Sequence, residues 1–238
     1  MSWFDIFIAS VTVLIGSTLQ GSVGFGMGLL ASPILMLIEP RFVPAPILLS
    51  TFCLTSFLVV REWDAIDVDG LRWAVVGRTG GTILAGFVLA VLPNDWMMMV
   101  LGLFMLFGVA MSMFGLKVKP TWSVLLCAGT LSGVMGTIAS IGGPPIALVY
   151  QDAPGARIRA TMSSLVWVGT IMSLIVLWLV GRFGEAELRL TLILLPGLFL
   201  GVFVSRWTAH VVDRGSTRAA VLSVAGLAGL AVVLRQLI

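Results

Sequence analysis

Charged side chains are scarce in this sequence. Asp, Glu, Lys and Arg make up 11% of its 238 residues, whereas an ordinary soluble domain carries about 25%. Hydrophobic residues make up 59% and the mean hydropathy is +1.11, which is more apolar surface than a soluble core can bury. The composition therefore excludes a water-soluble globular protein. It predicts an integral membrane protein that is embedded in the lipid bilayer.

Residues that bind metals or form covalent links are also few. The two cysteines, Cys53 and Cys127, lie far apart within apolar stretches, and His210 is the single histidine. This spacing excludes a disulfide framework and a zinc site of the CxxC type. The 14 Lys and Arg residues are scattered, without the basic run that is typical of nucleic-acid binding. We therefore expect no metal, no cofactor and no nucleic-acid partner.

Eight hydrophobic blocks are separated by short charged gaps. Most have the ~20 residues that a helix needs to cross a bilayer. Six of the eight tryptophans flank these blocks, as is typical of side chains at membrane interfaces. The sequence thus predicts an all-α integral membrane protein. The blocks span residues 4–38, 43–60, 71–92, 96–115, 121–151, 158–180, 188–209 and 217–238.

The first and fifth blocks, 4–38 and 121–151, contain residues that interrupt helices. Each block is too long for one crossing of the ~30 Å hydrocarbon layer and too short for two crossings with a loop. Glycine and proline cluster near the middle of both blocks. We therefore predict broken or hairpin helices in blocks one and five. The clustered residues are Gly21, Gly24, Gly26 and Gly28 in the first block, and Gly133, Gly136, Gly142, Gly143, Pro144 and Pro145 in the fifth.

The two interrupted blocks match one another, which indicates an internal duplication. Positions 18–38 match the later block at six places when shifted by 112 residues, and Gly21 then meets Gly133. We expect one membrane repeat at 1–116 and a second at 117–238, which together form one transport domain. Broken segments at matching places in two repeats indicate where a transporter binds its substrate.

The basic residues indicate how the interrupted blocks run. If every block crosses once, Lys and Arg divide seven against six between the two sides, but if blocks one and five are hairpins they divide nine against four. The positive-inside rule favours the uneven division. The second repeat would then be inverted relative to the first, with both termini outside the cytoplasm. The nine are Arg61, Arg72, Lys117, Lys119, Arg157, Arg159, Arg206, Arg214 and Arg218, and the four are Arg41, Arg182, Arg189 and Arg235.

Two glycine-rich segments carry a resemblance to a known family. They are Leu-Gln-Gly-Ser-Val-Gly-Phe-Gly at 19–26 and a degenerate second copy that ends in Ser-Ile-Gly-Gly-Pro-Pro at 140–145. Together with the eight-block layout, these segments resemble the sulfite exporter TauE/SafE family over essentially the whole chain. The resemblance implies a carrier of the bacterial inner membrane. It also implies small sulfur-containing anions as substrates, such as sulfite, sulfoacetate and other organosulfonates, moved mostly outward.

The distribution of charge within the blocks suits an anion. All 11 acidic residues fall in gaps or at block ends, which argues against a cation site or a carboxylate proton relay. Broken helices instead present free backbone N–H groups with partial positive charge, which can hold an oxyanion. The candidate binding residues, each of which could also serve helix packing, are Gln20, Gly21, Ser22, Gly24, Gly26, Ser50, Thr51, Arg78, Gly136, Ser140, Gly142, Gly143 and Ser163.

Arg78 is the one cation well inside a block, six residues beyond Arg72, or roughly 9 Å of helix rise. It could contact the anion, but at that depth we expect it to snorkel to the lipid headgroups. Backbone dipoles would then hold the anion, and replacement of Arg78 by Gln would weaken transport only modestly. Gly77 and Gly81 form a small-residue face, which serves packing within a protomer or in a homodimer.

Three classes of function remain for a protein with these features, and they differ in how well the sequence supports them. A secondary carrier that works by alternating access is favoured by the duplicated broken helices. An anion channel is the alternative within transport, since a glycine-lined gap could also be a pore. An intramembrane enzyme needs a nucleophile with a base, or a metal cluster, and a chain with one histidine and no acidic residue inside a block does not supply them. We therefore expect a transporter rather than an enzyme.

Overall fold

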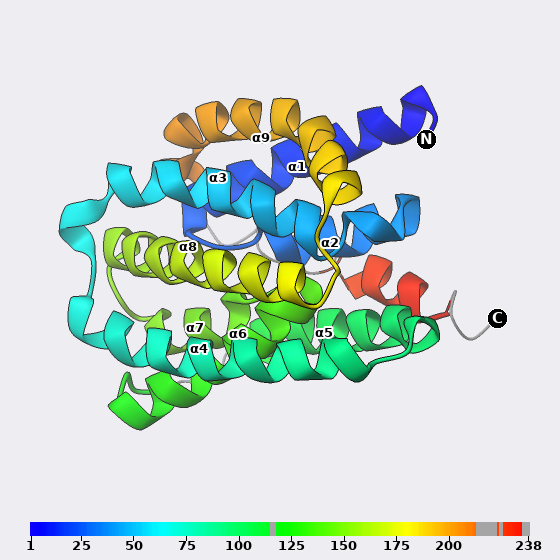
Figure 1. Cartoon of the computed structure of the whole chain (residues 1–238). Helices are drawn as coiled ribbons and strands as arrows, with labels where there is room; N and C mark the ends of the chain where they lie inside the picture. The colour runs from blue at the N-terminus through cyan, green and yellow to red at the C-terminus, as the bar shows by residue number, and fades with distance from the viewer. Residues whose placement is uncertain (115–117, 213–222, 224–225, 235–238) are drawn as a thin grey trace.

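The computed structural model describes residues 1–114, 118–212, 223 and 226–234, and these residues form helices and no strand (Figure 1). The all-α prediction is therefore confirmed for this part of the chain. Most of the eighth predicted block lies outside the described residues, as do Lys117, Arg214, Arg218 and Arg235. The helices are α1 (Trp3–Val23), α2 (Met27–Ile38), α3 (Ala45–Arg61), α4 (Val68–Val91), α5 (Asn94–Phe114), α6 (Trp122–Ala139), α7 (Gly143–Tyr150), α8 (Gly155–Leu179) and α9 (Glu185–Val212), with short 3-10 helices at Pro40–Phe42 and Trp63–Ala65.

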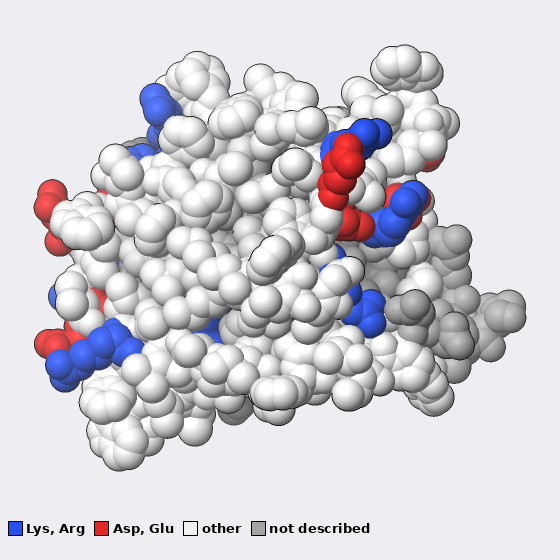
Figure 2. All heavy atoms as spheres, in the orientation of Figure 1, with Lys and Arg blue, Asp and Glu red and all other residues white. Residues whose placement is uncertain are grey.

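Seven helical segments within the described residues are long and apolar enough to cross a membrane. Figure 2 shows charged side chains gathered toward the two ends of the visible face, with a broad, mostly uncharged surface between them. Large hydrophobic side chains such as Phe87, Leu192 and Phe203 are exposed on this body, where lipid rather than water can cover them. The chain is therefore a multi-pass membrane protein.

Local sequence explains where α1 and α2 begin and end. The Ser2 hydroxyl accepts a hydrogen bond from the Asp5 amide while the Asp5 carboxylate accepts one from the Ser2 amide, a capping box that starts α1. The helix ends because Gly24 takes a left-handed conformation with φ 96°, and α2 begins after Gly26, whose φ is 127°. Glycine adopts both conformations without a steric penalty.

The junction between α6 and α7 has a different chemistry. Ser140 ends α6 with φ 62°, and its hydroxyl donates a hydrogen bond of 3.0 Å to the carbonyl oxygen of Pro44. Helix α7 then begins at Gly143 with Pro144 and Pro145 in its first turn, where proline fits because the first amides of a helix have no partner within it. Both long hydrophobic blocks thus consist of two helices joined by a few residues.

The connections from α2 to α3 and from α8 to α9 lie at one end of the bundle. Arg41 from the first connection and Arg182 from the second line the same surface pocket. The N-terminus lies at this end too (Figure 1). A hydrogen bond from Arg41 lowers the pKa of the Glu39 carboxyl, so a charged pair marks this end of the bundle.

The other end of the bundle carries a cluster of three arginines from α3, α8 and α9. Arg61, Arg159 and Arg206 line one surface pocket. The Arg159 Nε donates to both carboxylate oxygens of Glu62, at 2.9 and 3.1 Å, and the Arg61 Nη2 donates to the carbonyl of Gly21 at 2.8 Å. Arg61 and Arg159 are therefore already engaged with protein groups, and they tie α3 to the last turn of α1 and to the start of α8.

Glycine lets two pairs of helices pack backbone to backbone, α4 against α6 and α1 against α9. A Cβ at Gly77 would overlap the carbonyl of Leu126, and a Cβ at Gly81 would overlap that of Thr130. Such close approach is typical of small residues at membrane helix interfaces. The face formed by Gly77 and Gly81 is thus covered within the protomer, so it is not available to a homodimer.

We predict that the end with Arg61, Arg159 and Arg206 faces the cytoplasm, because Lys and Arg are concentrated in cytoplasmic loops. A fluorescent reporter that folds only in the cytoplasm should be bright when fused after Ala65 and dark when fused after Gly184. Immunoblots should show both fusions at similar levels. The reverse pattern would contradict the orientation, and equal brightness would contradict the separation of the two ends.

Candidate functional site

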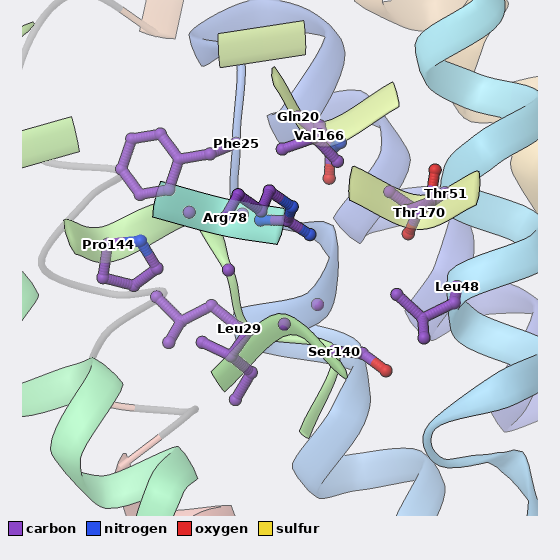
Figure 3. A pocket seen from close by; sticks show the side chains of 16 residues that line it. Gln20, Phe25, Leu29, Leu48, Thr51, Arg78, Ser140, Pro144, Val166 and Thr170 are labelled. Carbon is purple, nitrogen blue, oxygen red and sulfur yellow. The ribbon is translucent and has the colours of Figure 1, made fainter. Parts of the chain in front are cut away.

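The interruption between α1 and α2 lies directly against the one between α6 and α7. A Cβ at Gly28 would overlap the carbonyl oxygen of Ser140, and a Cβ at Gly143 would lie 2.9 Å from the Cβ of Phe25. The two junctions therefore meet inside the bundle. A cavity of about 30 Å³ lies between them (Figure 3).

The wall of this cavity is mostly apolar and contains few polar side chains, as is usual for sites that bind small molecules. Helices α1, α2, α3, α4, α6, α7 and α8 all contribute to it. No acidic residue is among the described residues that line it. The lining residues are Gln20, Phe25, Gly26, Gly28, Leu29, Leu48, Thr51, Arg78, Gly136, Ser140, Ile141, Gly142, Gly143, Pro144, Val166 and Thr170.

Arg78 on α4 is the one charged residue among the described residues of this wall. Its exposed fraction is 1%, and Figure 3 shows the side chain among the residues that surround the cavity. The Nη1 donates to the hydroxyl of Ser132 at 2.5 Å and to the Ser132 carbonyl at 3.3 Å. The Nε has no hydrogen-bond partner within the described part of the chain, and no described carboxylate forms an ion pair with the guanidinium. The snorkelling interpretation is therefore wrong, because the side chain points into the bundle.

Three glycines make room for the Arg78 guanidinium. A Cβ at Gly169 on α8 would overlap Nε, a Cβ at Gly142 would lie 2.5 Å from Nη1, and one at Gly136 would lie 2.8 Å from Nη2. Any larger residue at these positions would meet the planar head of the arginine. The guanidinium is thus held between α6, α8 and the α6–α7 junction.

Gln20 in the last turn of α1 supplies a second unpaired donor. Its Oε1 accepts a hydrogen bond of 3.2 Å from the amide of Met27, the first residue of α2. Because the oxygen faces this donor, the amide orientation is fixed and Nε2 points elsewhere. Nε2 has no partner among the described residues, although the exposed fraction of Gln20 is only 3%.

The starts of the two short helices offer unequal numbers of backbone donors. Pro144 and Pro145 lack an N–H, so the first turn of α7 provides fewer donors than a helix start normally does. In α2, the amide of Met27 is already bound to Gln20. Arg78 and Gln20 therefore add side-chain N–H groups to the few backbone N–H groups that these two helix starts offer.

Eight of the predicted binding residues line the cavity and five do not. The eight are Gln20, Gly26, Thr51, Arg78, Gly136, Ser140, Gly142 and Gly143. Among the others, Gly24 packs on the backbone of Arg159, and Gly21 packs on Ser205. The Ser22 hydroxyl bonds to the Thr18 carbonyl and to Thr208. Ser50 and Ser163 are buried outside the lining, and neither hydroxyl has a partner in the described structure.

Several residues of the cavity wall could not be predicted from the sequence. The apolar wall, for example Phe25, Leu29 and Val166, could not be recognised because every block is apolar. Ser132, the hydrogen-bond partner of Arg78, can be recognised from the sequence as a hydroxyl beside the second interruption, and a shift of 112 residues places it on Gln20. Both members of this pair thus bear a polar side chain beside a helix interruption.

A comparison with known families shows to which family this chain belongs. A family model described as Sulfite exporter TauE/SafE matches residues 8–232. The chain belongs to the sulfite exporter TauE/SafE family. TauE/SafE proteins are membrane transporters of sulfite and related sulfur anions, and the match includes both helix junctions and Arg78. No match was found among curated proteins or solved structures.

We predict that Gly169→Ala impairs the cavity around Arg78 without unfolding the protein. The new methyl group would push the Arg78 guanidinium out of its place, and overpacking of this kind costs about 1–3 kcal/mol. We expect sulfite transport into proteoliposomes to fall by about tenfold, equivalent to ~1.4 kcal/mol. Thermal unfolding of the purified protein should still be cooperative.

Gly80→Ala is the matched control for this substitution. Gly80 also lies in a long membrane helix, and a Cβ there meets nothing within 4 Å. This variant should transport as the unsubstituted protein does. Normal transport by Gly169→Ala would show that the position of the Arg78 guanidinium does not matter.

Proposed function

We propose that this protein is a secondary carrier that exports a small sulfur-containing anion, such as sulfite, sulfoacetate or another organosulfonate, across the bacterial inner membrane. The cavity between the two helix junctions is its binding site. The observation that carries this proposal is the buried Arg78, which lines the cavity and has no carboxylate partner among the described residues. Intramembrane charges of this kind usually mark the path of a substrate.

The electrostatics of the cavity favour an anionic ligand. A buried charge without a partner costs several kcal/mol, and an anion beside Arg78 would offset that cost. The unpaired donors Arg78 Nε and Gln20 Nε2 both belong to residues of the lining. Oxygens of a sulfite or sulfonate group could accept hydrogen bonds from both, which would satisfy two buried donors at once.

We further propose that the chain is built of two inverted repeats, 1–116 and 117–238. In these repeats α1 is equivalent to α6, and α4 is equivalent to α9. The two most closely packed helix pairs, α1 with α9 and α6 with α4, are therefore equivalent to each other. Gly77 packs on the carbonyl of Leu126 and Gly201 on that of Leu14, and these two leucines are 112 residues apart. This equivalence supports the duplication at the level of single contacts. Inverted repeats of this kind allow one unit to rock against the other around a fixed site.

The small size of the cavity supports a carrier over a channel. A volume of about 30 Å³ leaves room for only a few water molecules, so an organosulfonate requires the surrounding helices to separate. A carrier undergoes such a movement in every cycle, whereas an open channel needs none. Counterflow provides the test, because unlabelled sulfite on one side should drive labelled sulfite uphill in a carrier and not in a channel.

We predict that Arg78→Gln weakens anion binding by at least ~30-fold, since loss of a buried charged partner costs about 2–5 kcal/mol. The variant should unfold at the same or a higher temperature when no anion is present, because it removes an uncompensated buried charge. A purely structural arginine would instead leave a destabilised protein. Isothermal titration calorimetry with sulfite measures the affinity of the variant.

Arg72→Gln is the control because it makes the same change on the same helix. Arg72 is exposed, with a 3.4 Å ion pair to Asp69, and surface pairs contribute only ~0–1 kcal/mol. Its affinity for sulfite should stay within about threefold of the unsubstituted value, or ~0.7 kcal/mol. If Arg78→Gln lowers the affinity for sulfite by less than about tenfold, our assignment of Arg78 to the binding site is wrong. The backbone N–H groups at the helix N-termini would then be the main anion ligands.

A further inference from the structure

We propose that the cavity selects monoanions with a small apolar substituent, and that it rejects zwitterions and dianions. This inference rests on the proposed function and narrows its substrate class: it keeps hydrogensulfite and monoanionic sulfonates and removes the dianion sulfoacetate. It follows from the number of charges, donors and apolar groups that the described residues place around the cavity.

The cavity wall contains one positive charge and no negative charge among the described residues. A ligand with one negative charge therefore forms a neutral pair with Arg78. An ammonium group on the same ligand would be buried without a carboxylate, and a second anionic group would be buried without a cation. Either excess charge pays a large desolvation cost in this environment.

Among the described residues, the arginine cluster of Arg61, Arg159 and Arg206 lies outside the cavity wall. Arg61 donates to the carbonyl of Gly21 and to Glu62, and Arg159 donates to both oxygens of Glu62. Neither arginine is among the residues that line the cavity. A dianion would therefore find no second cation in the described wall of the cavity.

Two of the three hydroxyl groups in the described wall already donate to backbone carbonyls. Ser140 donates its hydroxyl proton to the carbonyl of Pro44, and Thr170 donates to the carbonyl of Trp167. Each can present only a lone pair to a ligand. The third hydroxyl, that of Thr51, donates only a weak hydrogen bond of 3.7 Å to the Met27 sulfur, so it can turn to a ligand. The side-chain donors left for the anion are those of Arg78, Gln20 and Thr51, which together suit one oxyanion group.

Apolar side chains surround the remainder of the cavity. Phe25, Leu29, Leu48, Pro144 and Val166 lie around the space beside Arg78 (Figure 3). A methyl or ethyl group can pack against these side chains, whereas a charged or strongly hydrated group would lose its water without replacement. For sulfite itself, the same reasoning makes the monoanion hydrogensulfite the bound form.

Three ligands of similar size separate these effects without any substitution in the protein. Ethanesulfonate is a monoanion with an apolar tail, taurine adds an ammonium group to it, and sulfoacetate carries a carboxylate as a second anionic group. Each ligand is titrated against the purified full-length protein in lipid nanodiscs at neutral pH. We expect taurine and sulfoacetate to bind at least about tenfold more weakly than ethanesulfonate, equivalent to ~1.4 kcal/mol.

A change of pH then provides an internal control for the zwitterion. At a pH high enough to deprotonate its amine, taurine becomes a monoanion and should approach the affinity of ethanesulfonate, measured at the same pH. Taurine or sulfoacetate binding within threefold of ethanesulfonate at neutral pH would overturn the inference. Failure of all three ligands and of sulfite to bind would instead overturn the proposed function.

Discussion

The buried guanidinium of Arg78 is the constraint on which the rest of the site depends. Its hydrogen bonds to Ser132 join α4 to α6, and its planar head occupies the space that side chains at Gly136, Gly142 and Gly169 would need. Glycine at these positions therefore has a specific reason beyond general helix packing. Because this charge has no carboxylate partner among the described residues, the empty protein bears a cost that a bound anion can remove.

The direction of the Arg78 side chain follows from the glycines beside it. Gly77 and Gly81 bring α4 into backbone contact with α6, and Arg78 lies between them on the sequence. A side chain on this tightly packed face cannot easily turn outward to the lipid headgroups. It extends instead along α6 toward the α6–α7 junction, where Gly136 and Gly142 leave room for it. The same close packing that stabilises the helix pair thus places the charge in the cavity.

The sequence was sufficient to predict the fold class and part of the site. Charge scarcity and block length predicted a helical membrane protein, and glycine clusters pointed to Gly26, Gly142 and their polar neighbours, which line the cavity. The environment of Arg78 could not be predicted, because distance from the block end gives depth and says nothing about which face of a uniformly apolar helix is buried. The sequence pattern places Gly24 in the site, but the structure gives another reason for a glycine at this position. Its backbone is left-handed, and it packs closely on the backbone of Arg159.

The contacts around the cavity differ in how easily they can separate, which bears on how a carrier of this design would open. The α4–α6 and α1–α9 pairs are held by glycines packed on backbone carbonyls, so sliding within a pair would force atoms to overlap. Between the two junctions, Gly28 also packs on the carbonyl of Ser140, but Phe25 meets Gly143 through a side chain that can move away. Opening should therefore preserve the pairs and part the junctions. Arg78 and Ser132 belong to one pair and Gln20 to the other, so a bound anion would bridge the two moving units.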